Sequence, residues 1–137
     1  MGKGRMTFEE LLAMARAEKP QRAKAENEEE YLQVECLRWL RAYSHGKYLA
    51  HHSPNEAKRS KVMGARLKAM GMMPGWPDLE IILPGGQVVF FEFKTAKGRQ
   101  SESQKECQKR LEETGCRYYL CRSVESFTET IKSLSHD

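Results

Sequence analysis

The sequence lacks the features of a membrane-inserted or secreted protein. No apolar run approaches the ~20 residues of a membrane span. The first residues, MGKGRMTFEE, lack the apolar core of a signal peptide. We therefore expect a protein of the cytoplasm.

Cysteine is scarce, and its spacing does not indicate a metal centre. The four cysteines, Cys36, Cys107, Cys116 and Cys121, form neither a CxxC pair nor the spacing of a zinc site. We expect free thiols in a reducing compartment.

Neither sign of charge dominates the chain. Lys and Arg number 23 and Asp and Glu 19, which gives a formal net charge of +4. Such a balance is compatible with a polyanionic partner without identifying one. The 137 residues, 39% of them hydrophobic, suffice for one domain with a core and not for two.

The order of helix and strand signals predicts an α/β fold in which helices flank a small mixed central sheet. Residues 1–27 are predicted to be an appendage, with a short helix opened by a Thr7–Glu10 capping box and a polar linker. The domain proper is predicted at 28–137. Its helices are expected at 28–44, 58–70, 102–114 and 123–135, and its strands at 47–52, 78–83, 88–94 and 116–121.

The helix predicted at 28–44 carries an acid on its apolar face. At 100° per residue this face holds Leu32, Cys36, Leu37, Trp39, Leu40 and Tyr43. Glu29 falls within it, and Gln33 follows one turn later. Either Glu29 reaches solvent from a frayed first turn, where it favours the helix dipole, or its carboxylate points inward towards a cation. This helix alone leaves both readings open.

Two adjacent histidines, His51 and His52, end the first predicted strand. Neighbouring side chains on a strand point to opposite faces, so these two cannot both bind one metal ion. We expect one to be buried and hydrogen-bonded and the other to be exposed.

The segment 75–98, GWPDLEIILPGGQVVFFEFKTAKG, predicts a β-hairpin with charged residues at its open end. Asp78 opens the first arm. Glu92 and Lys94 close the second arm, and they share one face because side chains alternate along a strand.

The register of this hairpin decides whether the acids meet. A two-residue glycine loop would carry Asp78 to the face of Phe93. A three-residue loop, 84–86, brings Asp78 opposite Glu92 and also groups the apolar side chains of both arms on the other face. We predict the second register because it satisfies burial and chemistry together.

Two carboxylates opposite each other destabilise a sheet unless a cation lies between them. An oxygen-lined site without thiolates suits Mg²⁺ or Mn²⁺. Lys94 can stabilise developing negative charge or orient a water nucleophile. Asp78, Glu92 and Lys94 are therefore suited to metal-assisted hydrolysis of a phosphodiester. The alternative is a structural sheet end in which Lys94 neutralises one acid.

Basic residues gather on both sides of the hairpin in the sequence. They are Lys58, Arg59, Lys61, Arg66 and Lys68 before it, and Lys97 and Arg99 after it. We predict that they contact DNA phosphates, since no base-reading motif is evident and little sequence preference is expected. The alternative is an ordinary solvated surface.

PD followed by ExK on the next strand resembles the PD-(D/E)xK nuclease superfamily. The wider set, which includes PNEAKRSKVMGARLKAMGMMPGWPDLEIILPGG, FFEFKTAKGRQSESQ and YLCRSVESF, resembles a stand-alone VRR-NUC domain of the phage and bacterial type. The likeness covers about residues 28 to 134. The literal Val-Arg-Arg string of the family name is absent.

The resemblance implies a restriction-endonuclease-like core and a role for each matching position. The implied metal ligands are Asp78, Glu92, the Phe93 backbone carbonyl and the helical acid Glu29, for which Glu30 is a rival. Lys94 would be the catalytic lysine. Gln104 and Gln33 match family glutamines, and the capping box of Ser101 with Gln104 is by itself a sufficient structural reason for Gln104.

The function implied is a Mg²⁺- or Mn²⁺-dependent DNA endonuclease. By resemblance it would act on branched DNA such as four-way junctions, as a homodimer, in a bacterial or phage-infected cell, without a membrane or a small-molecule cofactor. The competing hypothesis is a non-catalytic DNA-binding or packaging accessory module.

Overall fold

The computed structural model describes residues 7–11, 24–54 and 60–135. Its elements are α2 (Lys24–Ser44), β1 (Leu49–His52), α3 (Lys61–Ala69), β2 (Leu79–Ile82), β3 (Val88–Phe93), α4 (Glu102–Glu113), β4 (Arg117–Cys121) and α5 (Val124–Leu134). The order predicted for the domain and its α/β class are both confirmed. None of the helices within these residues is long and apolar enough to cross a membrane.

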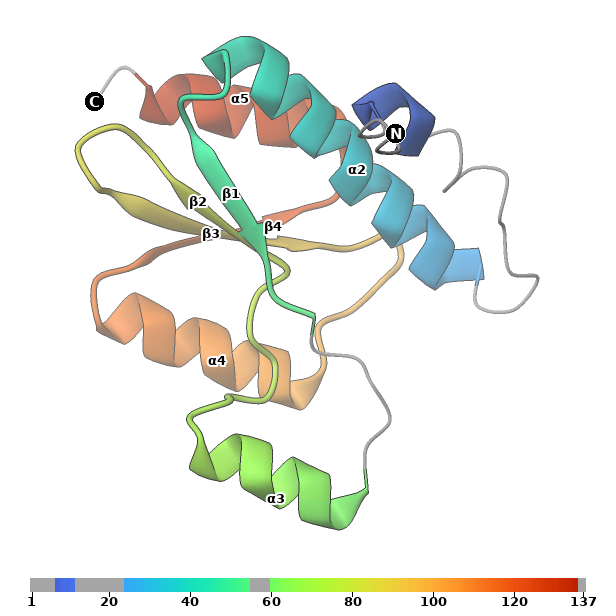
Figure 1. Cartoon of the computed structure of the whole chain (residues 1–137), viewed down its shortest axis with the longest axis vertical. Coiled ribbons are helices and arrows are strands. Elements are labelled where there is room, and N and C mark those ends of the chain that lie inside the picture. The colour runs from blue at the N-terminus through green and yellow to red at the C-terminus, as the bar shows by residue number, and fades with distance from the viewer. Residues whose placement is uncertain (1–6, 12–23, 55–59, 136–137) are drawn as a thin grey trace, which may run out of the picture.

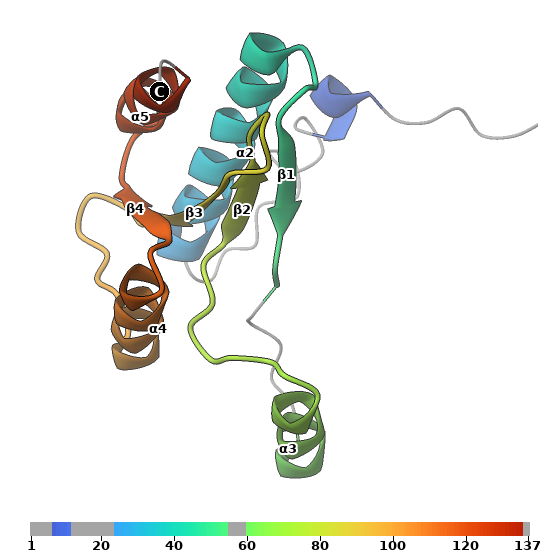
Figure 2. The same ribbon diagram turned by 90° about the vertical axis from the view of Figure 1, so that its left-hand side faces the viewer.

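The four strands form one mixed sheet in the order β1-β2-β3-β4. β1 pairs antiparallel with β2, and β2 antiparallel with β3. β4 joins β3 in parallel, after the crossover helix α4. The helices α2 and α5 cover one face of this sheet and α4 covers the other (Figure 1, Figure 2).

The larger core lies between the sheet and the helices α2 and α5. Phe91, Phe93 and Phe127 are fully buried there, and the edge of the Phe127 ring meets Phe91 at a centroid distance of 4.9 Å. Each such side chain contributes about 1.5–3 kcal/mol by leaving water. A smaller cluster of Phe90, Cys107, Leu111 and Tyr118 packs α4 on the opposite face. The sheet is thus fixed from both sides where the hairpin ends.

The first helix of the domain begins earlier than predicted. The polar, aperiodic residues 24–27 predict the end of a linker, yet α2 begins at Lys24. Lysine, alanine and glutamate favour a helix without any apolar periodicity, which explains the difference. The Thr7–Glu10 capping box is confirmed, with Thr7 N–H donating to Glu10 Oε2 at 2.7 Å. The rest of the predicted appendage, 1–6 and 12–23, lies outside the described residues.

The expectation of one buried histidine is wrong, since both His51 and His52 are exposed. β1 is an edge strand, and α4 covers β3 and β4 but not the face of β1 that carries His51. The His52 ring still has a role, because its Nδ1 donates to the backbone carbonyl of Asp78 at 2.7 Å. The four cysteines are free thiols, as predicted.

Candidate active site

The hairpin has the predicted three-residue turn and register. Leu83 N–H donates to Gln87 O at 2.8 Å, and Gly86 N–H returns to Leu83 O at 3.0 Å. Gly85 and Gly86 have φ of 93° and 81°, a region that glycine adopts without strain. Leu79 pairs with Phe91, so the same register, continued by one residue, places Asp78 opposite Glu92.

Asp78 is held from two directions at the start of β2. Its Oδ2 accepts the backbone N–H of Phe93 at 2.9 Å. Its own carbonyl accepts from His52 Nδ1 at 2.7 Å and from Ser53 N–H at 3.3 Å. The aspartate is therefore tied to both neighbouring strands. Only the backbone of Phe93 faces this site, since its ring is buried in the core on the other face.

Glu92 is an acid enclosed by protein, with 1% of its surface exposed. Its Oε1 accepts the amide of Gln104 at 3.0 Å. Its Oε2 is buried and accepts from no donor in the described part of the chain. Burial above all, and then the charge of Asp78, raise the pKa of Glu92 to about 9. Burial therefore favours the protonated form of Glu92 when no cation is bound.

Lys94 lies two residues beyond Glu92, on the same face of the chain, and is also buried. Its backbone N–H donates to Cys121 O at 3.0 Å, which continues the pairing with β4. The positive charge of Lys94 lowers the pKa of Glu92, against the larger effect of burial. A buried cation therefore lies next to the acid pair.

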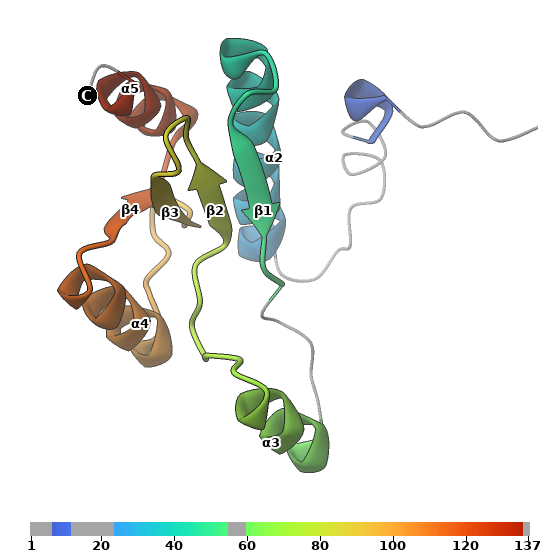
Figure 3. The same cartoon turned by 60° about the vertical axis from the view of Figure 1, so that its left-hand side comes forward.

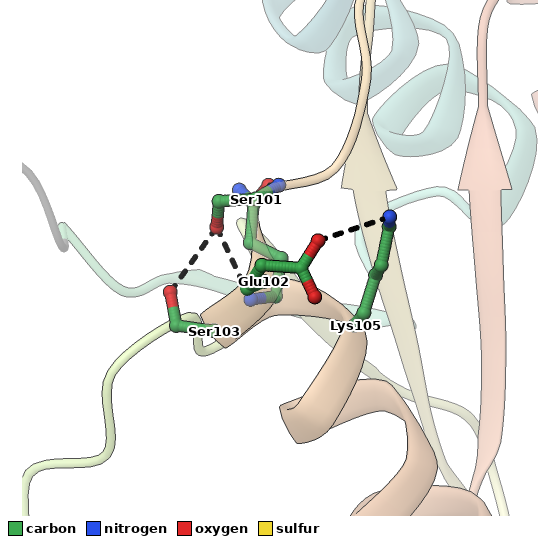
Figure 4. A network of polar contacts seen from close by, with 5 residues as sticks. Ser101, Glu102, Ser103 and Lys105 are labelled. Atoms are coloured by element: carbon green, nitrogen blue, oxygen red, sulfur yellow. Dashed lines mark hydrogen bonds and ion pairs between the residues drawn. The ribbon is translucent and has the colours of Figure 1, made fainter.

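Gln104 caps the start of α4 and also contacts Glu92. Its Oε1 accepts from Ser101 N–H at 2.8 Å, and the Ser101 hydroxyl accepts from Gln104 N–H at 3.2 Å, which completes a capping box at the start of α4. The same side chain donates its amide to Glu92. Figure 4 shows this first turn, where Ser103 also contacts the Ser101 hydroxyl. The start of α4 thereby holds the orientation of Glu92.

Of the two neighbouring glutamates in α2, Glu29 is the one near this site. Its charge also raises the pKa of Glu92. The loop after Lys94 passes so close that a Cβ added to Gly98 would lie 3.3 Å from Glu29 Oε1. Glu30, the rival, is exposed. Gln33, one turn later, contacts His52 Nδ1 at 3.0 Å and so borders the Asp78 side of the site.

Two residues near the site were missed by sequence reasoning. Arg122 Nη1 donates to the carbonyls of Thr95 and Gly98 at 2.6 and 2.7 Å, and so fixes the loop that follows Lys94. Gly75 has φ of 74°, and an added Cβ would overlap the backbone of Ser103 and Gln104. No local pattern marks either residue, because each acts on a segment more than 20 positions away.

Gly75→Ala should destabilise the protein by about 1–3 kcal/mol more than Gly85→Ala does. Both glycines have positive φ, but Gly85 has nothing within 4 Å of an added Cβ. The difference between the two variants therefore isolates the contact between Gly75 and α4. Urea unfolding at one pH measures it, and equal losses of stability in the two variants would contradict this packing.

The predicted DNA-binding residues are divided between two places. Lys97 and Arg99 are exposed in the loop directly after Lys94. Three others, Lys61, Arg66 and Lys68, are exposed on α3, which stands apart from the sheet and from α4 (Figure 3). Lys58 and Arg59 lie outside the described residues.

The acid pair fits a hard divalent cation. Among the described residues no group of three or more His, Cys, Asp and Glu side chains is arranged to hold a metal ion. Mg²⁺, however, is commonly bound by one or two carboxylates, with water and substrate phosphate completing its coordination. Glu92 Oε2 is buried and accepts from no donor in the described part of the chain, and Asp78 lies opposite it, so both acids offer oxygen ligands of the kind such a cation takes.

Comparison with known proteins identifies the family. The family model of the VRR-NUC domain matches residues 15–125. A solved structure described as "VRR_NUC domain" is similar to 77% of this chain over 95% of its own length, with 20% identity and a TM-score of 0.55. A second, "VRR_NUC domain protein", covers 77% of this chain and 85% of its own, with 21% identity and a TM-score of 0.58.

These two structures show a shared fold, and a comparison with curated proteins gave no match. The family match spans most of the chain and includes the hairpin with its acid pair and lysine. The chain therefore belongs to the VRR-NUC domain family, whose members are PD-(D/E)xK-type nucleases that generally use divalent metals.

Proposed function

We propose that the protein is a divalent-metal-dependent DNA endonuclease that hydrolyses phosphodiester bonds, with selectivity for branched DNA such as four-way junctions. One observation carries the proposal. A buried glutamate lies opposite an aspartate, has an oxygen without a donor, and is followed on the same face by a buried lysine.

Asp78, Glu92, the Phe93 carbonyl and Glu29 would hold the cation, Mg²⁺ or Mn²⁺. When bound, it supplies Lewis-acid charge that stabilises the phosphate and promotes ionisation of a water nucleophile. Gln104 occupies one oxygen of Glu92 and so keeps the other available.

Lys94 would act on the phosphate during the reaction. Lys94 is buried and its charge acts on Glu92, and low dielectric strengthens the interaction of such a charge with charge that develops in the transition state. The loop held by Arg122 presents Lys97 and Arg99 directly beyond it. These side chains are proposed to neutralise neighbouring phosphates, which favours backbone contact over base reading.

The decisive experiment compares a four-way junction with a linear duplex made from the same arms, each with Mg²⁺, Mn²⁺ or EDTA. We expect cleavage only with metal, faster on the junction, and none by Glu92→Ala. Metal-independent cutting, or full activity of Glu92→Ala, would contradict the proposed site. Binding without cutting under every condition would favour the accessory-module hypothesis.

We also propose that the active form is a homodimer, because two matching sites suit the two-fold symmetry of a junction. Light scattering with and without junction DNA measures this. A monomer at micromolar concentration under both conditions would contradict it.

A further inference from the structure

The helix α3 is unusual in this fold because none of its residues is buried. In all three views it stands apart from the sheet and covers neither of its faces (Figure 1, Figure 2, Figure 3). Its ends are well formed. Ser60 accepts from Met63 N–H at 3.1 Å, and Met72 N–H returns to Leu67 O at 2.9 Å past Gly71. A nine-residue helix without a buried residue gains little stability from the core.

Large apolar side chains on α3 nevertheless face solvent. Val62 is 71% exposed, Met63 44% and Met70, at the C-cap, 80%. Val62, Arg66 and Met70 follow one another at intervals of four residues, and Met63 precedes Met70 by seven. These four residues therefore form one stripe along the helix, the α3 stripe.

The charges around the α3 stripe indicate the kind of partner. Lys61 and Lys68, seven residues apart, lie on the opposite side of the helix from the stripe, and Arg66 lies within it. The sequence from Ser60 to Pro77 contains no acid. Two copies of α3 would repel each other, whereas a polyanion with accessible apolar surface would satisfy both features.

Nucleic acid with unstacked bases is such a partner. In a continuous duplex the base faces are covered by stacking, but they become accessible at a branch point or an unpaired stretch. Apolar side chains such as methionine and leucine insert beside bases in other DNA-binding proteins. We propose that the α3 stripe contacts base faces exposed at a branch or unpaired site, while Lys61 and Lys68 contact phosphates. This inference rests on the proposed action on DNA and assigns the structure selectivity to one helix.

The connection between α3 and the acid pair makes this contact useful. Residues 71–77 lead from α3 to Asp78, and Gly75 packs directly on the first turn of α4. The eight residues from Met70 to Asp78 span at most about 29 Å. That corresponds to about eight base-pair steps of 3.4 Å. We therefore expect cuts within one helical turn of the branch.

The test uses two variants of the full chain that change different properties. Val62→Ser/Met63→Gln/Met70→Gln removes the apolar groups without changing charge, and Lys61→Gln/Lys68→Gln removes two charges. Binding is measured in Ca²⁺ to a four-way junction, to a duplex with a short unpaired gap, and to a fully paired duplex. Circular dichroism and melting curves confirm that both variants keep the fold.

The stripe variant should bind the junction and the gapped duplex about tenfold more weakly, and the paired duplex within about twofold of the parent. The lysine variant should weaken all three and reduce the slope of log affinity against log salt by up to about two. The proposal is overturned if the stripe variant weakens binding to all three DNAs equally, or if it weakens binding to none of them.

Other occupants of the α3 stripe give different results. Loss of dimer in the stripe variant would assign the stripe to a second copy of the chain. Binding of the parent, but not of the stripe variant, to phosphatidylserine vesicles would assign it to a membrane surface. Either result, with unchanged DNA binding, overturns the inference. If the parent cleaves DNA and the stripe variant binds every DNA as the parent does, the proposed role of the α3 stripe is wrong and the proposed nuclease activity stands. If binding depends on the stripe but the parent cleaves nothing in Mg²⁺ or Mn²⁺, the nuclease activity is wrong and the role of the stripe stands.

Discussion

Lys94→Ala should lower the single-turnover rate of DNA cleavage by about 10²–10³-fold. Lys94 is a buried residue whose charge acts on Glu92, and in such an environment one charge has a large effect on a transition state. Lys97→Ala is the matched control, because Lys97 is exposed only three residues away. It should change the rate by less than about tenfold.

Removing Lys94 also removes a charge that lowers the pKa of Glu92, so the variant should need more metal. The rate must therefore be measured at saturating Mg²⁺, with binding in Ca²⁺ measured separately. If the cleavage rate of Lys94→Ala at saturating metal is within threefold of the parent's rate, Lys94 has only a structural role.

The metal-free protein should lose stability as pH rises, and Glu92→Gln should remove much of that loss. The pKa of Glu92 is raised from 4.5 to about 9 in the folded protein. Below pH 4.5 Glu92 is protonated in both the folded and the unfolded state, and its contribution to the free energy of unfolding is fully present. Between 4.5 and 9 only the folded state holds the proton, so folding weakens by about 1.4 kcal/mol per pH unit. From pH 5 to 8 the loss is up to about 4 kcal/mol.

Urea unfolding in EDTA at pH 5 and pH 8 measures this effect. Glu102→Gln is the control, because Glu102 is exposed at the start of α4 and should keep the parent's pH dependence. Mg²⁺ should reduce the loss of stability between pH 5 and pH 8 in the parent, and it should have little effect on the stability of Glu92→Gln. Identical pH dependence of the parent and Glu92→Gln would show that Glu92 is not protonated in the folded state.

The hairpin was predictable because two independent requirements select one register. Grouping the apolar side chains and closing a three-residue loop at 84–86 both place Asp78 opposite Glu92, and the pairing of Leu79 with Phe91 confirms it. The sequence predicts that Glu29 lies on the apolar face of its helix, but not that its carboxylate approaches the acid pair. The helical wheel leaves two readings open, and the approach of the Gly98 loop and the effect on the pKa of Glu92 distinguish Glu29 from the exposed Glu30.

Other features depend on contacts between distant segments, which a local pattern does not encode. Gly75 looks like any turn glycine until α4 packs on it. Arg122 looks like a solvated charge until the loop of Thr95 to Gly98 folds against it. The exposure of both histidines is not encoded locally, because the burial of a strand residue depends on the strand's place in the sheet, and β1 is an edge strand that α4 does not cover.

The hairpin that joins Asp78 to Glu92 also affects the order of folding. A hairpin closes in about 1–10 μs, faster than pairings between distant segments. The two carboxylates therefore meet early, whereas Gln104 arrives only when α4 docks and Glu29 only when α2 does. We infer that Asp78 and Glu92 repel each other early in folding, before Gln104 and Glu29 are in place beside them. The kinetics of folding should then respond to protons and divalent ions before an active site exists.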